Sequence, residues 1–232
     1  MRCSLDEFRA LLGEAEVASE LTAFLGADPV AGAPPEGGWI EALRALRHAT
    51  VLGFVEVGGS APLRGLVAIG DGSGIRVRVR GEEVTTEVMR TDAPWPALVG
   101  CLPEREPAEG CEVTVPTAEL AEARAEVDSR DRETDWLAYE LKRRLVPPDD
   151  ARAAADLLTR ADDFDARLSV GWRPDGALHR WAQGIDVHHA ATGRAAVIPE
   201  SPDGTFTLVT PADTYLLATT LQEHLEHLTG SV

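Results

Sequence analysis

Two pairs of histidines are the side chains of this chain whose spacing best suits metal binding. His188 and His189 are adjacent in a segment with the pattern of a strand, so their side chains point to opposite faces and do not share an ion. His224 and His227 lie three residues apart in a helical segment, but no carboxylate or cysteine motif completes a ligand shell around them. We therefore predict no metal and no other cofactor, and we interpret His224 and His227 as surface histidines.

Two further segments have the composition of a catalytic site but lack the context that catalysis requires. The segment 70–74, GDGSG, has no following helix and lysine for a phosphate-binding loop and no GxSxG nucleophile, so it predicts a hairpin. Asp162, Asp163 and Asp165 cluster at an expected helix end, which favours a loop over an acid–base pair. We therefore expect no catalytic residues and a protein that is not an enzyme; a hydrolase with a scattered site is the weakest alternative.

The charge balance limits the classes of partner. The 232 residues include 39 acidic and 22 basic side chains, which leave a formal net charge of −17. Nucleic acids and anionic membranes need Lys and Arg to displace their counterions, so both are poor partners for this chain. Hydrophobic residues make up 44% of the sequence, enough to bury a substantial core. The composition favours a globular protein with a protein partner.

The cysteines and the first residues indicate the compartment. Cys3, Cys101 and Cys111 are an odd number without CxxC spacing, which supports neither a disulfide framework nor a zinc site, so we expect buried thiols. The start, MRCSLDEFRALL, has no signal-peptide pattern, and no apolar stretch reaches the length of a membrane span. These observations predict a cytoplasmic protein that does not insert into membranes.

The segment from Val51 to Met89 has the pattern of an antiparallel meander. Short alternating runs are separated by the turns GGSAP, GDGSG and RGEE. In the third run, apolar residues alternate with arginines, so the arginines line the outward face of the sheet; they are Arg76, Arg78 and Arg80. This face either meets a partner or pairs with Glu83 and Glu87 of the next strand.

The order of elements occurs twice along the chain, each time as helices, a run of strands and a further helix. The first copy is helical from Leu5, strand-like over Val51–Met89 and helical near Pro94, and the second is helical from Thr117, strand-like from about Arg167 to Leu208 and helical after Pro211. We predict one α+β domain over residues 1–232 with quasi-two-fold halves of about 1–115 and 116–232. Its central, mainly antiparallel sheet is flanked by helical bundles, and a Gly/Pro/Ala loop over 26–38 is expected to be flexible.

Three segments of the chain together resemble the EspG family, the dedicated cytosolic chaperones of ESX, or type VII, secretion. They are ALVGCLPEREPAEGCEVTVPTAELAEA at 97–123, RRLVPPDDARAAADLLTRADDFDARLSVGWRPDG at 143–176 and ATGRAAVIPESPDGTFTLVTPADTYLLATTLQEHL at 191–225. The shared features are an LVG-LP turn before a VTVP strand, a PP-x-DA helix start, a GR-x-V strand and a final TPAD step from strand to helix. The resemblance covers the chain from about Thr50 to its end.

The resemblance implies binding rather than turnover. A chaperone of this family binds the apolar tip of the PPE partner in a PE–PPE heterodimer and keeps the pair soluble for export. Its partner surface is formed by the sheet face and the C-terminal helices. We place the partner-binding residues at Arg76, Arg78 and Trp172 on sheet edges or turns, with Leu217 and Leu221 as groove residues; the core is the alternative place for both leucines.

Two other interpretations of the partner stay open at this stage. A small acidic protein without catalytic motifs is also typical of an immunity or inhibitor protein that binds a basic toxin. An open sheet edge would also allow the chain to associate with a second copy of itself as a homodimer. The genes beside the coding gene and the proteins that copurify separate these interpretations.

Overall fold

The computed structural model describes residues 1–15, 17–30, 39–70, 72–128, 134–200 and 203–230. The chain forms two compact units, which are described separately. Unit 1 comprises residues 1–103, 167–182 and 217–232, and unit 2 comprises residues 104–166 and 183–216. Among the described residues, no helix is both long enough and apolar enough to cross a membrane.

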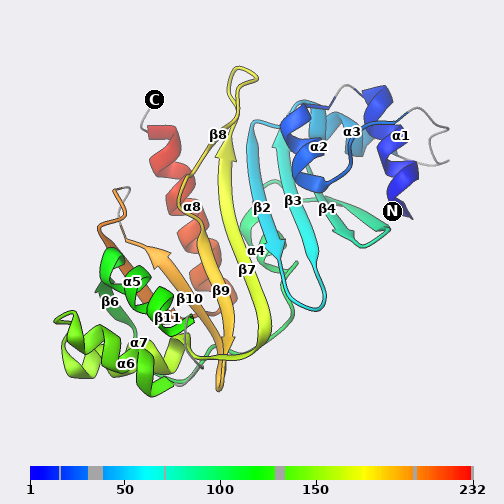
Figure 1. Cartoon of the computed structure of the whole chain (residues 1–232). Helices are drawn as coiled ribbons and strands as arrows, with labels where there is room; N and C mark the ends of the chain where they lie inside the picture. Colours follow the sequence, from blue (N-terminus) through cyan, green and yellow to red (C-terminus); the bar gives the residue numbers. More distant parts are fainter. Residues whose placement is uncertain (16, 31–38, 71, 129–133, 201–202, 231–232) are drawn as a thin grey trace. The chain divides into compact units, whose positions relative to one another are not determined.

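Unit 1 contains a meander with helices packed on it (Figure 1). Its elements are β1 (Arg2–Ser4), α1 (Leu5–Ala15), α2 (Ser19–Leu25), α3 (Trp39–Arg47), β2 (Val51–Val57), β3 (Leu63–Gly70), β4 (Ser73–Arg80), β5 (Glu83–Met89), α4 (Pro94–Val99), the end of β7 (Arg160–Trp172), β8 (His179–Arg180) and most of α8 (Thr214–Gly230). The strand order is β1-β5-β4-β3-β2-β7, with β8 paired to β7. The pairings β1–β5, β5–β4, β4–β3, β3–β2 and β7–β8 are antiparallel.

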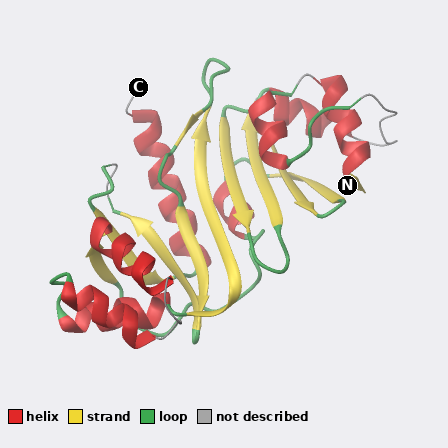
Figure 2. Ribbon diagram, viewed as in Figure 1, coloured by secondary structure: helices red, strands yellow, loops and turns green. Residues whose placement is uncertain are grey.

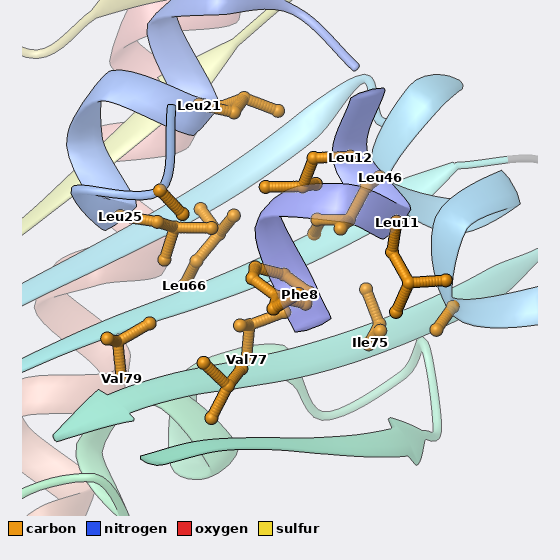
Figure 3. Close-up of a cluster of buried hydrophobic side chains, with 14 of the residues drawn as sticks. Phe8, Leu11, Leu12, Leu21, Leu25, Leu46, Leu66, Ile75, Val77 and Val79 are labelled. Carbon is orange, nitrogen blue, oxygen red and sulfur yellow. The ribbon is translucent and has the colours of Figure 1, made fainter. Parts of the chain in front are cut away.

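The core of unit 1 lies between α1–α3 and one face of the meander. Phe8 and Leu12 of α1 recur at helical spacing and point at the alternate strand residues Leu66 and Val77 (Figure 3). All four side chains are at most 1% exposed. The chain enters α1 through Ser4, whose hydroxyl and backbone N–H both donate to the Glu7 carboxylate at 2.8 Å, as in a capping box.

Unit 2 has its own core, which packs on a run of paired strands. Its elements are β6 (Val113–Pro116), α5 (Thr117–Asp128), α6 (Thr134–Arg143), α7 (Pro148–Leu158), the start of β7, β9 (Ile185–Ala190), β10 (Gly193–Pro199) and β11 (Phe206–Pro211). The strand order is β7-β9-β10-β11-β6, and the pairings β9–β10, β10–β11 and β11–β6 are antiparallel. Residues of α5, α6 and α7 pack on alternate residues of β6, β10 and β11, including Val115, Ala195 and Val209.

The element order repeats along the chain. Among the described residues, a short strand, three helices, four long strands and a helix run from β1 to α4, and the same series runs from β6 to α8 with β8 as an addition. In each series the first, short strand pairs with the last strand of the meander, β1 with β5 and β6 with β11. The predicted α+β class with a mainly antiparallel sheet is confirmed (Figure 2). The division into halves near residue 115 stays a prediction.

Two local predictions from the sequence are wrong. Asp162, Asp163 and Asp165 lie on β7 and not in a loop, because β7 begins at Arg160, directly after α7. Within the region predicted to be strand-like from about Arg167 to Leu208, the segment 181–184 forms no strand, and β9 begins only at Ile185. The hairpin at 70–74 is confirmed in its described residues, whereas residues 31–38 of the loop expected to be flexible lie outside the described part of the chain.

Candidate partner-binding surfaces

The alternation of β4 places its arginines on the face of the meander opposite the α1–α3 core. Ile75, Val77 and Val79 are at most 7% exposed in that core, as predicted. Arg76 forms an ion pair with Glu87 of β5 and donates a hydrogen bond to the Ala97 carbonyl of α4 at 3.0 Å. The alternative that the arginines pair with β5 is therefore confirmed for Arg76.

Glu83, the other carboxylate predicted to pair with the β4 arginines, pairs with an arginine of β1 instead. Its carboxylate forms an ion pair with Arg2 of β1, with 2.6 Å between Nε and Oε1. Arg80 lies opposite Glu83 in the register of β4 and β5. Arg78, which lies between Arg76 and Arg80 on β4, forms no ion pair or hydrogen bond with any residue that the structure describes.

Arg76, Arg78 and Glu87 lie at a hollow of about 420 Å³ at the edge of unit 1. It is lined by Met1, Arg2, Arg76, Arg78, Thr85, Thr86 and Glu87, and we call it the arginine hollow.

The buried thiol of Cys101 lies close to Arg76 and Arg78. Burial raises the pKa of Cys101 to about 11 and outweighs the opposing effect of both guanidinium groups. The thiol is therefore protonated near neutral pH and is no nucleophile.

A second hollow, of about 390 Å³, is lined by residues of β2, β3 and β4 and of α1 and α2. Its lining includes the apolar residues Leu25, Val57 and Leu63, together with the charged residues Glu56 and Arg64. This mixture offers apolar surface beside one charge of each sign, and it contains none of the residues that the sequence placed at a partner surface.

The other predicted contact residues lie in neither hollow. Trp172 is half-buried at the end of β7, where its ring lies 6.1 Å from that of His179. Leu217 and Leu221 are fully buried on α8, at 0% exposure. They occupy the place that the core interpretation gives them, and whether any of these three residues contacts a partner stays a prediction.

The histidines have structural partners. His188 donates from Nε2 to the Leu157 carbonyl at 2.8 Å, while His189 bonds through Nδ1 to Asp162 at 2.9 Å and stacks on Phe164 with ring centroids 4.0 Å apart. The hydrogen bond from His189 lowers the pKa of Asp162. These two neighbouring histidines thus have separate partners, as strand alternation predicts.

The interpretation of His224 as a surface residue is wrong. It is 5% exposed and stacks on Trp181, with ring centroids 5.0 Å apart and planes 20° from parallel. Cys111 is exposed rather than buried, as is typical of a loop residue. In the described ranges, no group of three or more His, Cys, Asp or Glu residues has the arrangement of a metal site.

An apolar surface on α6 is absent from the sequence predictions. Trp136 and Leu145 have the residue types of a buried helix stripe, but they are 40% and 92% exposed, and Tyr139 is 54% exposed. The rings of Trp136 and Tyr139 meet edge to face at 5.8 Å. We call Trp136 and Tyr139 of α6, together with Leu145 just beyond its end, the α6 surface. The helical periodicity of the sequence does indicate this exposure. When Leu137 and Leu141 face the core, positions 136 and 139 point away from it.

Leu145 is held out by the backbone. Its φ of +66° is the only positive φ of a non-glycine residue among those described. The Leu145 N–H donates to the Lys142 carbonyl and the Val146 N–H to the Leu141 carbonyl, at 3.0 and 3.1 Å. This is the Schellman end of a helix, which normally has glycine at this position. A leucine here adds strain of about 1 kcal/mol while its side chain lies in water.

The match to known families agrees with this architecture. A model of the EspG family matches residues 12–223 of the chain. The chain belongs to the EspG family. A solved structure with the same fold is that of the Mycobacterium tuberculosis type VII secretion system chaperone EspG5 in complex with the PE25–PPE41 dimer, with a TM-score of 0.74 and 14% sequence identity. The match covers 97% of this EspG-family chain and 95% of the other, and no curated protein matches.

Proposed function

We propose that this EspG-family protein is a cytoplasmic chaperone that binds PE–PPE-type heterodimers and keeps them soluble for type VII secretion. The observation that carries the proposal is the family match over residues 12–223, together with a fold shared over nearly the whole of both chains with EspG5, a chaperone solved with such a dimer. On this proposal the protein acts by binding and is not an enzyme. A toxin inhibitor has no comparable support.

The α6 surface is the proposed contact for the apolar part of the partner. Large apolar side chains gathered on a surface are typical of protein interfaces, and aromatic residues such as Trp and Tyr are enriched there. Leu145 supports this use, because glycine would form the same helix end without strain, and the leucine side chain is 92% exposed. Arg76 and Arg78 are proposed as polar contacts at the arginine hollow, and Trp172 is proposed as a half-buried contact at the end of β7.

Coexpression tests the proposal directly. A tagged copy of this chain is produced with a PE–PPE pair encoded beside its gene, and we expect a complex with one copy of each of the three chains on size exclusion. Changing Trp136 and Tyr139 together to Ser should abolish the complex while leaving the melting temperature unchanged. The matched control is Val88→Ser, which removes an exposed apolar side chain of β5. Absence of any complex with the parent chain contradicts the proposed function.

A further inference from the structure

The arginine hollow carries positive charge on a strongly acidic protein. Three arginines line it, Arg2, Arg76 and Arg78, against one carboxylate, that of Glu87. The chain as a whole has a formal net charge of −17. We propose that this hollow binds an acidic segment of a partner protein through carboxylates that pair with Arg78 and Arg76.

The pairing state of the arginines singles out Arg78. Glu87 is already engaged by Arg76, and Arg2 is engaged by Glu83. Arg78 is half-buried, and it has no recorded hydrogen bond or ion pair with the described part of the chain. A guanidinium with five N–H donors that is partly removed from water gains from a carboxylate partner. The chain has 39 acidic side chains, yet none of those that the structure describes forms an ion pair with Arg78. Arg78 is therefore available to a carboxylate of a partner protein.

The register sets the spacing of the ligand groups. Arg76 and Arg78 point to the same face of β4 and are separated by about 7 Å along the strand. Thr85 lies opposite Arg78, and Arg2 lies opposite Thr85, so these three residues form one row across the strands. Carboxylates at alternate positions of an extended segment have the same spacing. The planar fork of each arginine binds a carboxylate through two parallel hydrogen bonds.

The size and surroundings of the hollow favour a protein segment over other anions. A volume of about 420 Å³ holds several side chains, far more than one small inorganic anion needs. A nucleic acid would need many more cationic contacts than three arginines to overcome repulsion by the acidic remainder of the molecule. Side chains of a partner protein can present two carboxylates without a continuous line of phosphates.

This inference rests on the proposed function only for the identity of the partner. The chaperone role requires that an EspG-family chain copurifies with a secreted pair, whereas the hollow is tested with the isolated protein and a peptide. Failure of one experiment therefore leaves the other standing.

The test measures fluorescence anisotropy of a labelled Gly-Glu-Gly-Glu-Gly-Glu peptide at low ionic strength. We expect saturable binding that Arg78→Gln weakens by about tenfold, the effect of losing one charge-assisted bidentate pair. Glu87→Gln should tighten binding, because it removes the carboxylate that competes for Arg76. The matched control is Arg64→Gln, the same charge change on the opposite face of the meander, and it should bind like the parent.

Other results overturn the inference. Equal weakening by Arg64→Gln and Arg78→Gln would mean general charge attraction, whereas equal binding of an uncharged Gly-Gln repeat peptide would mean that the hollow does not recognise carboxylates. Full competition by inorganic phosphate at the peptide's own concentration would assign the hollow to a small anion. Self-association on size exclusion that Arg78→Gln abolishes would assign it to a second copy of this chain. The parent melting temperature must be kept by Arg78→Gln, since Arg78 has no recorded partner to lose.

Discussion

The guanidinium of Arg173 donates a hydrogen bond to the backbone carbonyl of Arg47 at 2.7 Å. The same side chain also donates to the carbonyls of Ala49 and Leu46, at 3.1 and 3.4 Å. Arg173 follows β7, and the carbonyls it binds lie at and just beyond the end of α3. The last carbonyls of a helix have no partner within the helix, so a buried cation that binds them stabilises both the helix end and its position.

Replacing Arg173 by Met should destabilise the protein by about 3 kcal/mol, because several carbonyls lose a donor at a site where Arg173 is 7% exposed. Urea unfolding measures the loss. The control is Arg80→Met on exposed β4 surface, which we expect to change stability by less than about 0.5 kcal/mol. Equal effects of both changes would contradict a special role for Arg173.

Replacing Leu221 by Asp should unfold the protein, since the new carboxylate would enter a site with 0% exposure on α8. Circular dichroism detects the loss. Tyr215→Asp on the same helix, at a side chain that is 80% exposed, should leave the spectrum unchanged. A folded Leu221→Asp variant that fails to bind a partner would instead support the groove interpretation of this leucine.

Replacing Leu145 by Gly should stabilise the protein by about 1 kcal/mol, because glycine adopts the positive φ at the end of α6 without strain. Leu145→Ala keeps the strain and removes most of the side chain, so its stability should stay near that of the parent. Thermal unfolding compares the three. If the side chain contacts the partner, both variants weaken the complex, and a gain in stability with unchanged binding would remove Leu145 from the α6 surface.

Acid should destabilise the protein through two buried histidines. Burial lowers the pKa of both His188 and His224 from 6.5 to about 4. As pH falls from 6.5 towards 4, the unfolded chain binds these protons and the folded protein does not, so stability is greatest above 6.5 and falls through this window. Each histidine contributes a slope of about 1.4 kcal/mol per pH unit.

His224→Phe isolates one of these contributions. The phenyl ring keeps the stacking on Trp181 and takes up no proton, so urea unfolding at pH 7, 6 and 5 should show a shallower loss of stability than in the parent. An unchanged pH profile would mean that the buried imidazole does not control this window.

Periodicity and turn chemistry could be read from the sequence where they are local. The alternation of Ile75, Val77 and Val79 determined one face of β4, and the Ser4–Glu7 spacing fixed the start of α1. Arg173 shows the limit. Its sequence context, RPDG, predicts the turn that follows β7, but no local pattern shows that the side chain reaches carbonyls more than a hundred residues earlier.

The surfaces were harder to predict than the fold. Arg76 and Arg78 are equivalent in the sequence, yet only Arg76 has Glu87 and the Ala97 carbonyl as partners, a difference that depends on where α4 lies. Trp136 and Leu145 have the residue types of a core stripe, so their exposure depends on the rotation of α6 and on a left-handed residue at its end.

The short strands β1 and β6, which open the two repeated series of elements, have a consequence for aggregation. β1 has three residues and β6 has four, and Pro116 in β6 has no N–H to offer. Each lies outermost in the strand order of its unit. An outermost strand is the template on which chains add to one another and form aggregates, and a brief one limits that growth. Because β1 pairs with β5 and β6 pairs with β11, the longer strands of each meander are covered. Other chains therefore cannot pair with the edges of these longer strands at high concentration.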